Sequence, residues 1–413
     1  MHLNSLLKKL RRRYPHGLFC FTWWIYLRCE KEKIHFEANR SLRGRCPKAI
    51  WFLIQLALSL RWKRFFAHQE IENALRIYGE SINKKESIPI NELRKTVQQL
   101  AFRFCIPPVD AIHFRLYRQP ERALDFIFST EVHGFHNLRN DFRVTNDHLV
   151  LQDKLRFSRR SIAAGLPCIT KSILIRKGEQ EDWARLLSWD SKSVFCKSRY
   201  GFGGVGAFGL WKRGDKVIGR KQDGSEIKSD EDAKVALQKL MSKVDVLVQP
   251  FIEGHPVLQS ASCSGASVSL RVITQNSLGK PKVLASIIRV PRLAASKSTG
   301  MGHDFLVHVV AKIEQETGRI VKSPNSTISL HPRLHSIETS VFSVLRENSF
   351  VPFWKDIVNY SCAAQAEYNQ LWAVAWDWIV TTDGPVLLEG NAIWGVTQPQ
   401  ETHDGLLSGI IDH

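Results

Sequence analysis

The chain lacks the patterns that assign many proteins to a class at first sight. Its eight cysteines form no C-x-x-C pair, and no histidine pair follows them at the spacing of a zinc site. No apolar run approaches the roughly 20 residues that a membrane-spanning helix needs. Internal repeats and low-complexity tracts are also missing. We therefore expect reduced, mostly buried thiols in a globular protein of the cytoplasm.

The positive charge of the chain is distributed unevenly. Of the 413 residues, 58 are Lys or Arg and 40 are Asp or Glu, which gives a formal net charge of +18. Residues 1–66 hold 15 of the basic residues and only three of the acidic ones, so two thirds of the excess lies there. The length suits two or three domains. We predict a basic, mainly helical extension over residues 1–105 and a body over residues 106–413.

Two apolar runs, residues 18–27 and 49–60, lie within the basic segment. The first follows basic residues, as in a signal peptide, but charged residues come directly after it and no small-residue cleavage site is present. We expect a pair of amphipathic or core helices. They either pack on the body or let residues 1–66 lie on an anionic membrane at its inner, cytoplasmic face. Nucleic acid is not an expected partner, because no recognition motif accompanies the charge.

The body mixes strands and helices without regular β-α-β alternation. Ile106-Pro107-Pro108 marks a break after a helical segment over residues 67–105. Strands are predicted at 194–197, 244–251, 268–274, 283–290, 371–380 and 385–389, and helices at 229–242 and 336–345. This pattern predicts an α+β fold.

A glycine loop follows one predicted strand and its lysine. Gly201, Gly203 and Gly206 satisfy G-x-G-x-x-G, but a hairpin pattern follows where a dinucleotide-binding fold needs a helix. The sequence contains neither G-K-[ST] nor the H-R-D and D-F-G motifs of protein kinases. Glycines let backbone N–H groups approach phosphate oxygens, and the preceding Lys197 adds a cation. The alternative is an ordinary glycine-rich hairpin. The loop that we expect at a phosphate also contains Ser198 and Gly204.

An acidic hairpin is predicted near the C-terminus, where two apolar runs flank Asp383-Gly384. If residues 382–384 form a three-residue loop, Asp377 lies opposite Glu389, and Asn391 shares the face of Glu389. Two facing carboxylates in apolar surroundings need a cation, and Mg²⁺ with nucleotide phosphates fits that need. A solvent-facing polar stripe is the alternative, and a two-residue loop would shift the register by one.

Two further features point to nucleotide chemistry. The strand over residues 246–251 is apolar and ends in a polar exit, where Gln249 and Glu253 can hydrogen-bond an adenine ring. Arg271 and Arg289 each lie inside an apolar strand. A buried guanidinium needs an anion, which is either a structural carboxylate or a phosphate.

Taken in order, these segments resemble the ATP-grasp superfamily, and in particular its sugar-transfer-associated branch, which is related to glutamate ligases. The resemblance covers residues from about 110 to 400. The matching motifs are V-Q-P-F-I-E-G-H-P at 248–256, S-V-S-L-R-V-I-T at 267–274, E-T-G-R-I at 316–320 and G-P-V-L-L-E-G-N at 384–391, with D-K at 153–154 and A-A-G-L-P at 163–167 upstream.

The resemblance implies a role for each matched residue. The phosphates of ATP would be bound by Lys154 and Lys197, and adenine and ribose by Gln249, Ile252 and Glu253. The transferred phosphoryl group would face Arg271 and Arg289, and Mg²⁺ would be bound by Asp377, Glu389 and Asn391. In this picture Lys197, Arg271 and Arg289 are catalytic. A small lid subdomain over about residues 170–250 and a nucleotide- and Mg-binding subdomain over about 251–400 would grip the ATP.

The implied activity is that of a carboxylate–amine ligase. Such an enzyme uses ATP to convert a carboxylate to an acyl phosphate, which an amine, a sugar or a similar acceptor then attacks. The branch is found with polysaccharide genes, so a cell-envelope intermediate is the expected substrate. One segment departs from the branch, since Asp304-Phe305 and Val307-His308 stand where D-N and G-G are usual. A catalytically inactive ATP-binding scaffold at the membrane surface, and a small-molecule or sugar kinase with the same ATP site, therefore remain alternatives.

Overall fold

The structure is a computed structural model, and it divides into two compact units. It describes residues 15, 17–41, 47–140, 142, 145–179, 193–201, 206–213, 216–263, 266–277, 279–294, 305–323, 330–331, 334–345 and 349–411. Unit 1 comprises Met1–Val144, Lys322–His335 and Ile393–His413. Unit 2 comprises Thr145–Val321 and Ser336–Ala392.

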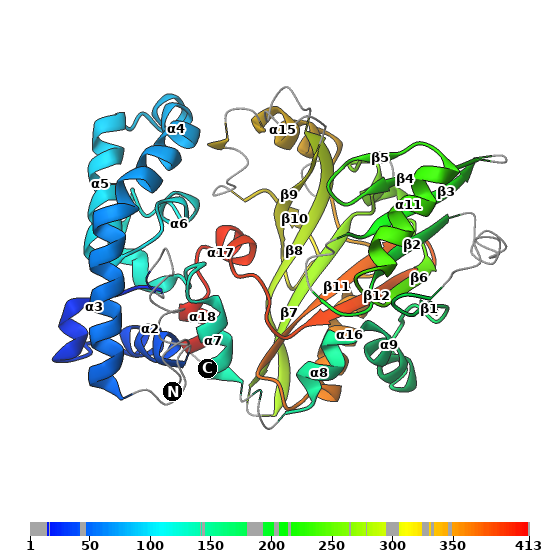
Figure 1. Ribbon diagram of the computed structural model, residues 1–413, viewed down its shortest axis with the longest axis horizontal. Helices are drawn as coiled ribbons and strands as arrows, with labels where there is room; N and C mark the ends of the chain where they lie inside the picture. Colours follow the sequence, from blue (N-terminus) through cyan, green and yellow to red (C-terminus); the bar gives the residue numbers. More distant parts are fainter. Residues whose placement is uncertain are drawn as a thin grey trace. The chain divides into compact units, whose positions relative to one another are not determined.

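Unit 1 is helical (Figure 1). Its elements are η1 (Phe21–Trp24), α2 (Glu30–Ser41), α3 (Lys48–Phe65), α4 (Ala67–Glu86), α5 (Ile90–Phe104), α6 (Pro108–His113), η2 (Pro120–Asp125), α7 (Val132–Arg139), α17 (Thr397–His403) and α18 (Leu407–Ile411). Aromatic side chains dominate its core: Trp23, Trp51 and Trp62 are fully buried. Each large ring removes much apolar surface from water, which is the main term that holds helices together.

The two apolar runs of the N-terminal segment have different structures. Residues 49–60 lie within α3, as predicted for a helix. In residues 18–27 the prediction of an amphipathic or core helix is wrong, because the run contains only the four-residue 3₁₀ turn η1. Phe19 donates its backbone N–H to the carbonyl of Phe104, so the start of this run is tied to the end of α5 instead of continuing a helix.

The hydrophobic core of unit 1 extends across the predicted boundary at residue 105. Trp51 and Trp62 belong to the same buried cluster as Ile112, Phe126 and Phe128. A domain consists of the elements that share one core. The contact-defined unit therefore takes in residues on both sides of residue 105, and the division at that residue stays a prediction.

Unit 2 contains two six-stranded sheets in which all paired neighbours run antiparallel. One has the order β1-β6-β2-β3-β4-β5 and the other β10-β9-β8-β7-β11-β12. The strands of the first are β1 (Ile173–Ile175), β2 (Ser193–Ser198), β3 (Phe208–Arg213), β4 (Lys216–Lys221), β5 (Glu226–Ile227) and β6 (Val246–Pro250). Those of the second are β7 (Ser269–Ser277), β8 (Lys280–Ala294), β9 (Phe305–Ile313), β10 (Ile320–Val321), β11 (Ala373–Thr381) and β12 (Gly384–Asn391).

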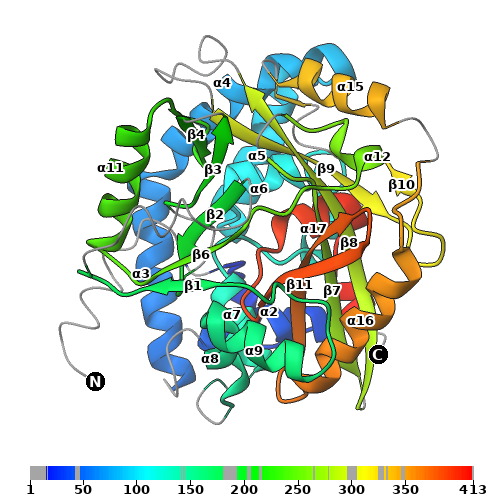
Figure 2. The same cartoon turned by 90° about the vertical axis from the view of Figure 1, so that its right-hand side faces the viewer.

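Helices cover one face of each sheet. Figure 2 shows α11 beside the first sheet, where it packs on β4. On the second sheet, α16 packs on β7, β8 and β11, while α8 and α9 pack on β12. The helices of unit 2 are α8 (Asp147–Gln152), α9 (Lys154–Ala163), α11 (Asp230–Met241), α12 (Pro256–Gln259), α15 (His335–Val344) and α16 (Trp354–Glu367).

Alternation along β11 decides which side chains the helices cover. The indole of Trp378 hydrogen-bonds Ser361 of α16, and Trp376 stacks on Phe157 of α9 with ring centroids 6.5 Å apart. Because neighbouring strand residues point to opposite faces, Asp377 lies on the other face of the sheet. That face carries the site described below.

The α+β class predicted from the sequence is confirmed. Strands or helices occur at every predicted position of the body, including the hairpin that follows the glycine loop. The elements of unit 2 that were not predicted include α8, α9, β1, β9 and α16. No helix in the part of the chain that the structure describes is both long and apolar enough to cross a membrane.

Candidate functional site

The C-terminal hairpin brings the predicted acidic residues Asp377 and Glu389 together, but its turn differs from the predicted one. The loop has two residues, because Thr381 pairs with Gly384, so the three-residue loop is wrong. A β-bulge then takes up one residue, and Asp377 pairs with Glu389 as predicted. Leu388 is the extra residue of this bulge, and it restores the register that the short turn shifts.

Three predicted metal ligands form a compact cluster, in which Asp377 comes from the middle of β11 and Glu389 and Asn391 come from the end of β12. The side-chain nitrogen of Asn391 lies 3.5 Å from Asp377 Oδ2 and 3.5 Å from Glu389 Oε1. Asp377 is 3% exposed, so its carboxylate is almost entirely removed from water. An isolated charge at such a position would be costly, and a compensating group is required.

Two arginines supply that compensation for Asp377. Arg271 binds its carboxylate with Nε and Nη2 at 2.8 Å each, and Arg289 Nη2 lies 3.2 Å from Oδ1. Each arginine therefore has a structural carboxylate as its partner, which was one of the two predicted possibilities. The two strands make this possible, since Arg271 on β7 is paired directly with Asp377 on β11.

The pKa of the Asp377 carboxyl reflects this competition. Burial opposes ionisation, but the charges and hydrogen bonds of Arg271 and Arg289 outweigh it and lower the pKa to about 2. Burial disfavours the charged form of Arg289 as well, and it lowers the pKa of this guanidinium despite the carboxylate of Asp377 beside it. The carboxylate of Asp377 is thus ionised at neutral pH, and the guanidinium groups of Arg271 and Arg289 bind it.

The cluster fits a hard divalent cation. A carboxylate offers about four acceptor positions, and the arginines use three of those on Asp377. Glu389 provides further oxygens nearby, and the amide of Asn391, whose nitrogen faces both carboxylates, would present its oxygen to a cation after a flip of the amide group. Mg²⁺ is typically held by one or two carboxylates plus substrate phosphates. Among the described residues no cluster of three or more His, Cys, Asp and Glu side chains could hold a metal alone, so the amide and a substrate would complete the shell.

Two lysines face the acidic cluster. Lys197 extends from β2 and is 8% exposed. Burial lowers its pKa to about 8, while Glu389 opposes the shift and Lys154 adds to it. Burial also lowers the pKa of Lys154, again against the pull of Glu389. Both ammonium groups are therefore partly shielded from solvent and lie close to the carboxylate of Glu389. An anionic ligand would stabilise their charged forms.

An ion pair fixes Lys154 relative to Lys197. Asp153 caps the start of α9 by accepting hydrogen bonds from the backbone N–H groups of Leu155 and Arg156. Its carboxylate also accepts from Arg199 Nε at 3.0 Å and from Nη2 at 2.7 Å. Arg199 follows β2 directly, and its carbonyl accepts the Lys154 N–H at 3.1 Å. The helix with one lysine is thus joined to the strand with the other.

The described part of the glycine loop borders the same cavity. Gly201 and Gly206 have φ of +103° and +81°, which side chains with a Cβ rarely adopt. The Gly201 carbonyl accepts a hydrogen bond of 2.7 Å from Lys154 Nζ. Ser198 Oγ hydrogen-bonds the carbonyl of Tyr200. The predicted residues Gly203 and Gly204 lie outside the described residues.

The hinge strand β6 contributes Gln249 to the cavity. Its Nε2 donates to Ser172 Oγ at 2.8 Å, whereas its buried Oε1 has no hydrogen-bond partner among the described residues. Ile252 also lines the cavity, and its carbonyl accepts from Ser267. Glu253 is exposed and is not among the lining residues. The structure therefore brings two of the three predicted adenine-side residues to the cavity.

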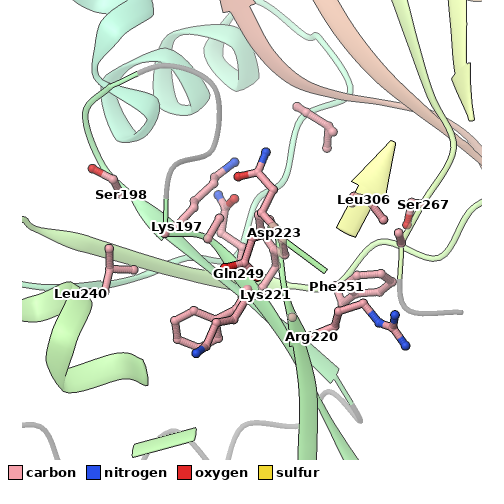
Figure 3. Close-up of a pocket in the computed structure, with 18 of the residues that line it drawn as sticks. Lys197, Ser198, Arg220, Lys221, Asp223, Leu240, Gln249, Phe251, Ser267 and Leu306 are labelled. Carbon is pink, nitrogen blue, oxygen red and sulfur yellow. The ribbon is translucent and has the colours of Figure 1, made fainter. Parts of the chain in front are cut away.

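All of the predicted site residues that the structure describes, except Glu253, converge on one cavity of about 1070 Å³ within unit 2. Figure 3 shows Lys197 and Gln249, from the neighbouring strands β2 and β6, pointing into it. Cationic side chains outnumber acidic ones along the wall. The cationic ones are Lys154, Lys197, Arg220, Lys221, Lys228, Lys239, Lys243, Arg271 and Arg289, and the acidic ones are Asp223, Glu226, Asp232, Asp377 and Glu389. Such a balance favours a polyanionic ligand.

Several lining residues were not predicted. Arg220 and Lys221 come from β4, and His308 from the unpredicted strand β9. Burial and the charges of Arg289 and Arg271 lower the pKa of His308 to about 4, so its ring is neutral at pH 7. A lone polar residue within the apolar run at 305–311 was the available signal for His308. The capping position before α9 was the signal for Asp153.

Comparison with known families identifies the class of protein. The sequence matches the family described as sugar-transfer associated ATP-grasp over residues 135–410, about two thirds of the chain. The chain therefore belongs to this ATP-grasp family, as the motifs predicted. A search of curated proteins found no significant match.

Solved structures with some likeness include three ligases. A D-alanine–D-alanine ligase from Bacillus anthracis is 13% identical with a TM-score of 0.39, over 64% of this chain and 67% of that one. The D-alanine–D-alanine ligase from Coxiella burnetii is 12% identical with a TM-score of 0.37, over 64% and 56%. VanG D-Ala:D-Ser ligase from Enterococcus faecalis is 13% identical with a TM-score of 0.37, over 64% and 61%. The chain thus spans about three fifths of the length of these proteins.

Proposed function

We propose that the protein is an ATP-dependent ligase that activates a carboxylate as an acyl phosphate and joins it to an amine or similar nucleophile. The observation that carries the proposal is the convergence of the buried Lys197, the half-buried Lys154, Arg271 and Arg289 and a carboxylate–amide cluster on one cavity of about 1070 Å³. Membership of the ATP-grasp family supports ATP as the nucleotide.

The lysines and the glycine loop form the proposed phosphate site. Lys154 and Lys197 offer two ammonium groups, and backbone N–H groups near Gly201 and Gly206 would add hydrogen bonds without charge. The unpartnered Oε1 of Gln249 is an acceptor that suits the exocyclic amino group of adenine. A buried acceptor without a hydrogen-bond partner costs free energy. A donor from the ligand would therefore stabilise both the folded protein and the bound nucleotide.

The acidic cluster forms the proposed metal site. Glu389 and Asn391 would hold Mg²⁺ together with nucleotide phosphates. The carboxylate position of Asp377 that the arginines do not use would be a further ligand of the cation. When bound, the cation would neutralise charge on the transferred phosphoryl group. The arginines that hold Asp377 would also stabilise negative charge that develops on the phosphoryl oxygens.

The proposed reaction has two steps. In the first, a carboxylate oxygen of the substrate attacks the γ-phosphorus of ATP, the bond to the β–γ bridging oxygen breaks, and ADP leaves. In the second, the acceptor nitrogen attacks the acyl carbon, the carbon–oxygen bond breaks, and inorganic phosphate leaves while the nitrogen loses a proton. Lys197, Arg271 and Arg289 would hold the anionic groups in line, which is most of what phosphoryl transfer requires.

As the substrate we propose a sugar-linked or peptide intermediate of cell-envelope biosynthesis, and the association of the family with sugar transfer supports the sugar-linked member of this class. A polar, anionic substrate agrees with the excess of lysine and arginine along the cavity wall. We propose a cytoplasmic location, in keeping with the proposed use of ATP. An association of the protein with a membrane is argued separately below.

Trapping of the acyl phosphate tests this function. Purified full-length protein would be incubated with Mg-ATP, hydroxylamine and a panel of carboxylates that includes uronic acids, D-amino acids and glutamate. A ligase should form a hydroxamate and ADP in equal amounts, and Lys197→Ala and Glu389→Ala should abolish both. Mg-ATP binding that is unchanged in both variants would refute the site.

The same experiment separates the two alternatives. A kinase would release ADP and form a phosphoester that hydroxylamine does not cleave. A scaffold without activity would bind Mg-ATP and form neither product with any member of the panel. The departure at Asp304-Phe305 motivates the scaffold, and Asp304 lies outside the described residues.

A further inference from the structure

The helix α3 of unit 1 contains a long uncharged segment that presents an apolar face to solvent. In α3 the residues between Lys48 and Arg61 include no charged side chain. Trp51, Leu58 and Trp62 fill the core of the unit from one side of this helix. Since residues three and four apart share a face, Leu53 and Leu60 lie together on the opposite side.

That outer face is strongly exposed. The exposed fractions are 48% for Ile50, 63% for Leu53 and 59% for Leu60, and Ala57 between them is exposed as well. A helix that is apolar all round is normally buried on all sides. The exposed half of α3 therefore calls for a covering surface.

A second group of exposed aromatic residues adjoins this face. Phe21 and Trp24 of η1 pack edge-on against Phe52 of α3, with ring centroids 5.4 and 4.3 Å apart. Ile25 and Tyr26 follow at 73% and 52% exposed. Figure 1 shows the dark blue segment that contains η1 beside α3. We call the residues Phe21, Trp24, Ile25, Tyr26, Ile50, Leu53 and Leu60 the apolar face.

Basic residues lie at both ends of α3. Lys48 begins the helix, and Lys63 and Arg64 lie in its last turn, all three exposed. No ion pair of these three is found among the described residues. Between residues 38 and 69 the sequence has seven Lys and Arg and no Asp or Glu. A second copy of the chain would bring like charges together here, whereas an anionic surface would be attracted.

From these observations we infer that the apolar face of unit 1 docks on an anionic lipid membrane, with α3 lying in the plane of the interface. Exposed leucines and aromatic rings enter the boundary between headgroups and acyl chains. Trp24 and Tyr26 belong to the residue types that favour this boundary. Lys63 and Arg64 extend their charges to the lipid phosphates. The proposed ligase would thereby work beside membrane-bound intermediates.

Vesicle co-sedimentation of the full-length protein tests the inference. The probes are vesicles of phosphatidylcholine alone and vesicles of equal parts phosphatidylcholine and phosphatidylglycerol. We expect at least about tenfold tighter binding to the anionic vesicles, with a loss at high salt. Leu53→Gln/Leu60→Gln should weaken that binding by at least about tenfold. Lys63→Gln/Arg64→Gln should remove most of the preference for anionic lipid.

A matched control keeps general surface polarity constant. Ile90 and Leu138 are also exposed apolar residues of unit 1, at 38% and 37%, but lie outside the apolar face. Ile90→Gln/Leu138→Gln should bind the vesicles like the unchanged protein. Far-ultraviolet circular dichroism and Mg-ATP affinity show whether each variant is folded.

Three results would overturn the inference. One is absence of binding to anionic vesicles by folded protein. Another is an equal affinity of the Leu53→Gln/Leu60→Gln variant and its control. The third is a concentration-dependent dimer, seen by sedimentation velocity without lipid, that Leu53→Gln/Leu60→Gln dissociates while vesicle binding is absent, since a second copy would then cover the face.

Discussion

At the scale of single residues, Lys197 has a charge that depends on its surroundings. Burial lowers the pKa of its ammonium group to about 8, and the carboxylate of Glu389 keeps it from falling further. A phosphate that entered the cavity would favour the charged form and raise this pKa. Binding of a nucleotide should therefore be linked to the protonation of Lys197.

This linkage predicts a pH dependence of nucleotide affinity. Below about pH 8 Lys197 is charged in the free protein, so affinity should be constant. Above it each unit of pH should weaken binding by up to about tenfold, because a proton must be taken up first. Isothermal titration calorimetry of Mg-ATP in buffers of different ionisation enthalpy measures both the affinity and the proton uptake.

Lys197→Arg is the control for that measurement. A guanidinium group does not lose its proton in this pH range, so the variant should show a flat profile and no proton uptake. A profile of the unchanged protein that is equally flat up to pH 10 would show that Lys197 does not bind the phosphates.

Asp377 should be more important for stability than a metal ligand alone would be. Asp377→Asn leaves Arg271 and Arg289 buried without their carboxylate, which should lower the free energy of unfolding by about 3–5 kcal/mol. Urea denaturation measures this difference. In the double variant Arg271→Met/Asp377→Asn the loss should be smaller than the sum of the single losses. Additive losses would show that the pair does not interact.

Acid should act on the same carboxylate. The folded-state pKa of Asp377 is lowered to about 2, from an ordinary value of about 3.9 in an unfolded chain. Its stabilising contribution is therefore present above about pH 4 and is lost as the pH falls toward 2.

At the scale of elements, the Asp153–Arg199 pair joins α9 to β2. Arg199→Gln should weaken Mg-ATP binding by about tenfold, because Lys154 would no longer be held beside Lys197. The exposed Arg176 provides a control in the same unit, and Arg176→Gln should leave the affinity unchanged within about twofold. Calorimetric titration of the two variants decides the matter: equal affinities would mean that Lys154 keeps its position without the pair.

The strands and helices of unit 2 show what local sequence could predict. Apolar runs bounded by glycine and proline were sufficient for β6, β7 and β11, whose residues alternate or are buried on both faces. The strand β9 was missed because its register depends on β8, which is a non-local pairing. The helix α16 was missed because Asn359, Ser361 and Cys362 in its middle have weak helix propensity, and packing decides there.

The site was predictable where the backbone alone determines a face. The pairing of Arg271 with Asp377 and of Asp377 with Glu389 follows from neighbouring strands, and the motifs at 267–274 and 384–391 lie on such strands. Glu253 was assigned to the adenine side but follows the end of β6, and no periodicity fixes the direction of a loop side chain. The partnership of Asp153 with Arg199 joins segments 46 residues apart and has no local signal.

At the scale of the whole molecule, the core of unit 1 and the cavity of unit 2 involve different residues. The prediction of a helical segment before residue 105 needed only apolar periodicity. Which helices share a core was not predictable, because Trp51 and Trp62 meet partners such as Phe128 that lie far along the chain. The charge of residues 1–66 distinguishes them from the rest of the chain. Aromatic side chains of the same segment, such as Trp51 and Trp62, nevertheless belong to the core of unit 1.

Stability and nucleotide binding should therefore respond to different substitutions. Trp62 is fully buried in unit 1, and its indole N–H donates to the carbonyl of Ala101 at 3.0 Å. Trp62→Ala should lower the free energy of unfolding of this unit by about 3–5 kcal/mol. Every described residue that lines the cavity belongs to unit 2, so Mg-ATP affinity should stay within about twofold.

The same helix supplies the control for this prediction. Leu60, which is 59% exposed, should tolerate alanine with a change of less than about 0.5 kcal/mol. Thermal unfolding followed by circular dichroism compares the two variants. A loss of Mg-ATP binding in folded Trp62→Ala protein would show that unit 1 contributes to the site.

The bulge at Leu388 has a consequence for how relatives of this chain should be aligned. A hairpin with a two-residue turn and a bulge has the same spacing between Asp377 and Glu389 as one with a three-residue turn and none. Two such chains would align column by column without a gap. They would still differ in structure, because the extra residue of a bulge leaves its backbone groups outside the ladder, here directly beside Glu389. Equal motif spacing in an alignment is thus compatible with two different sets of backbone donors and acceptors beside the carboxylates.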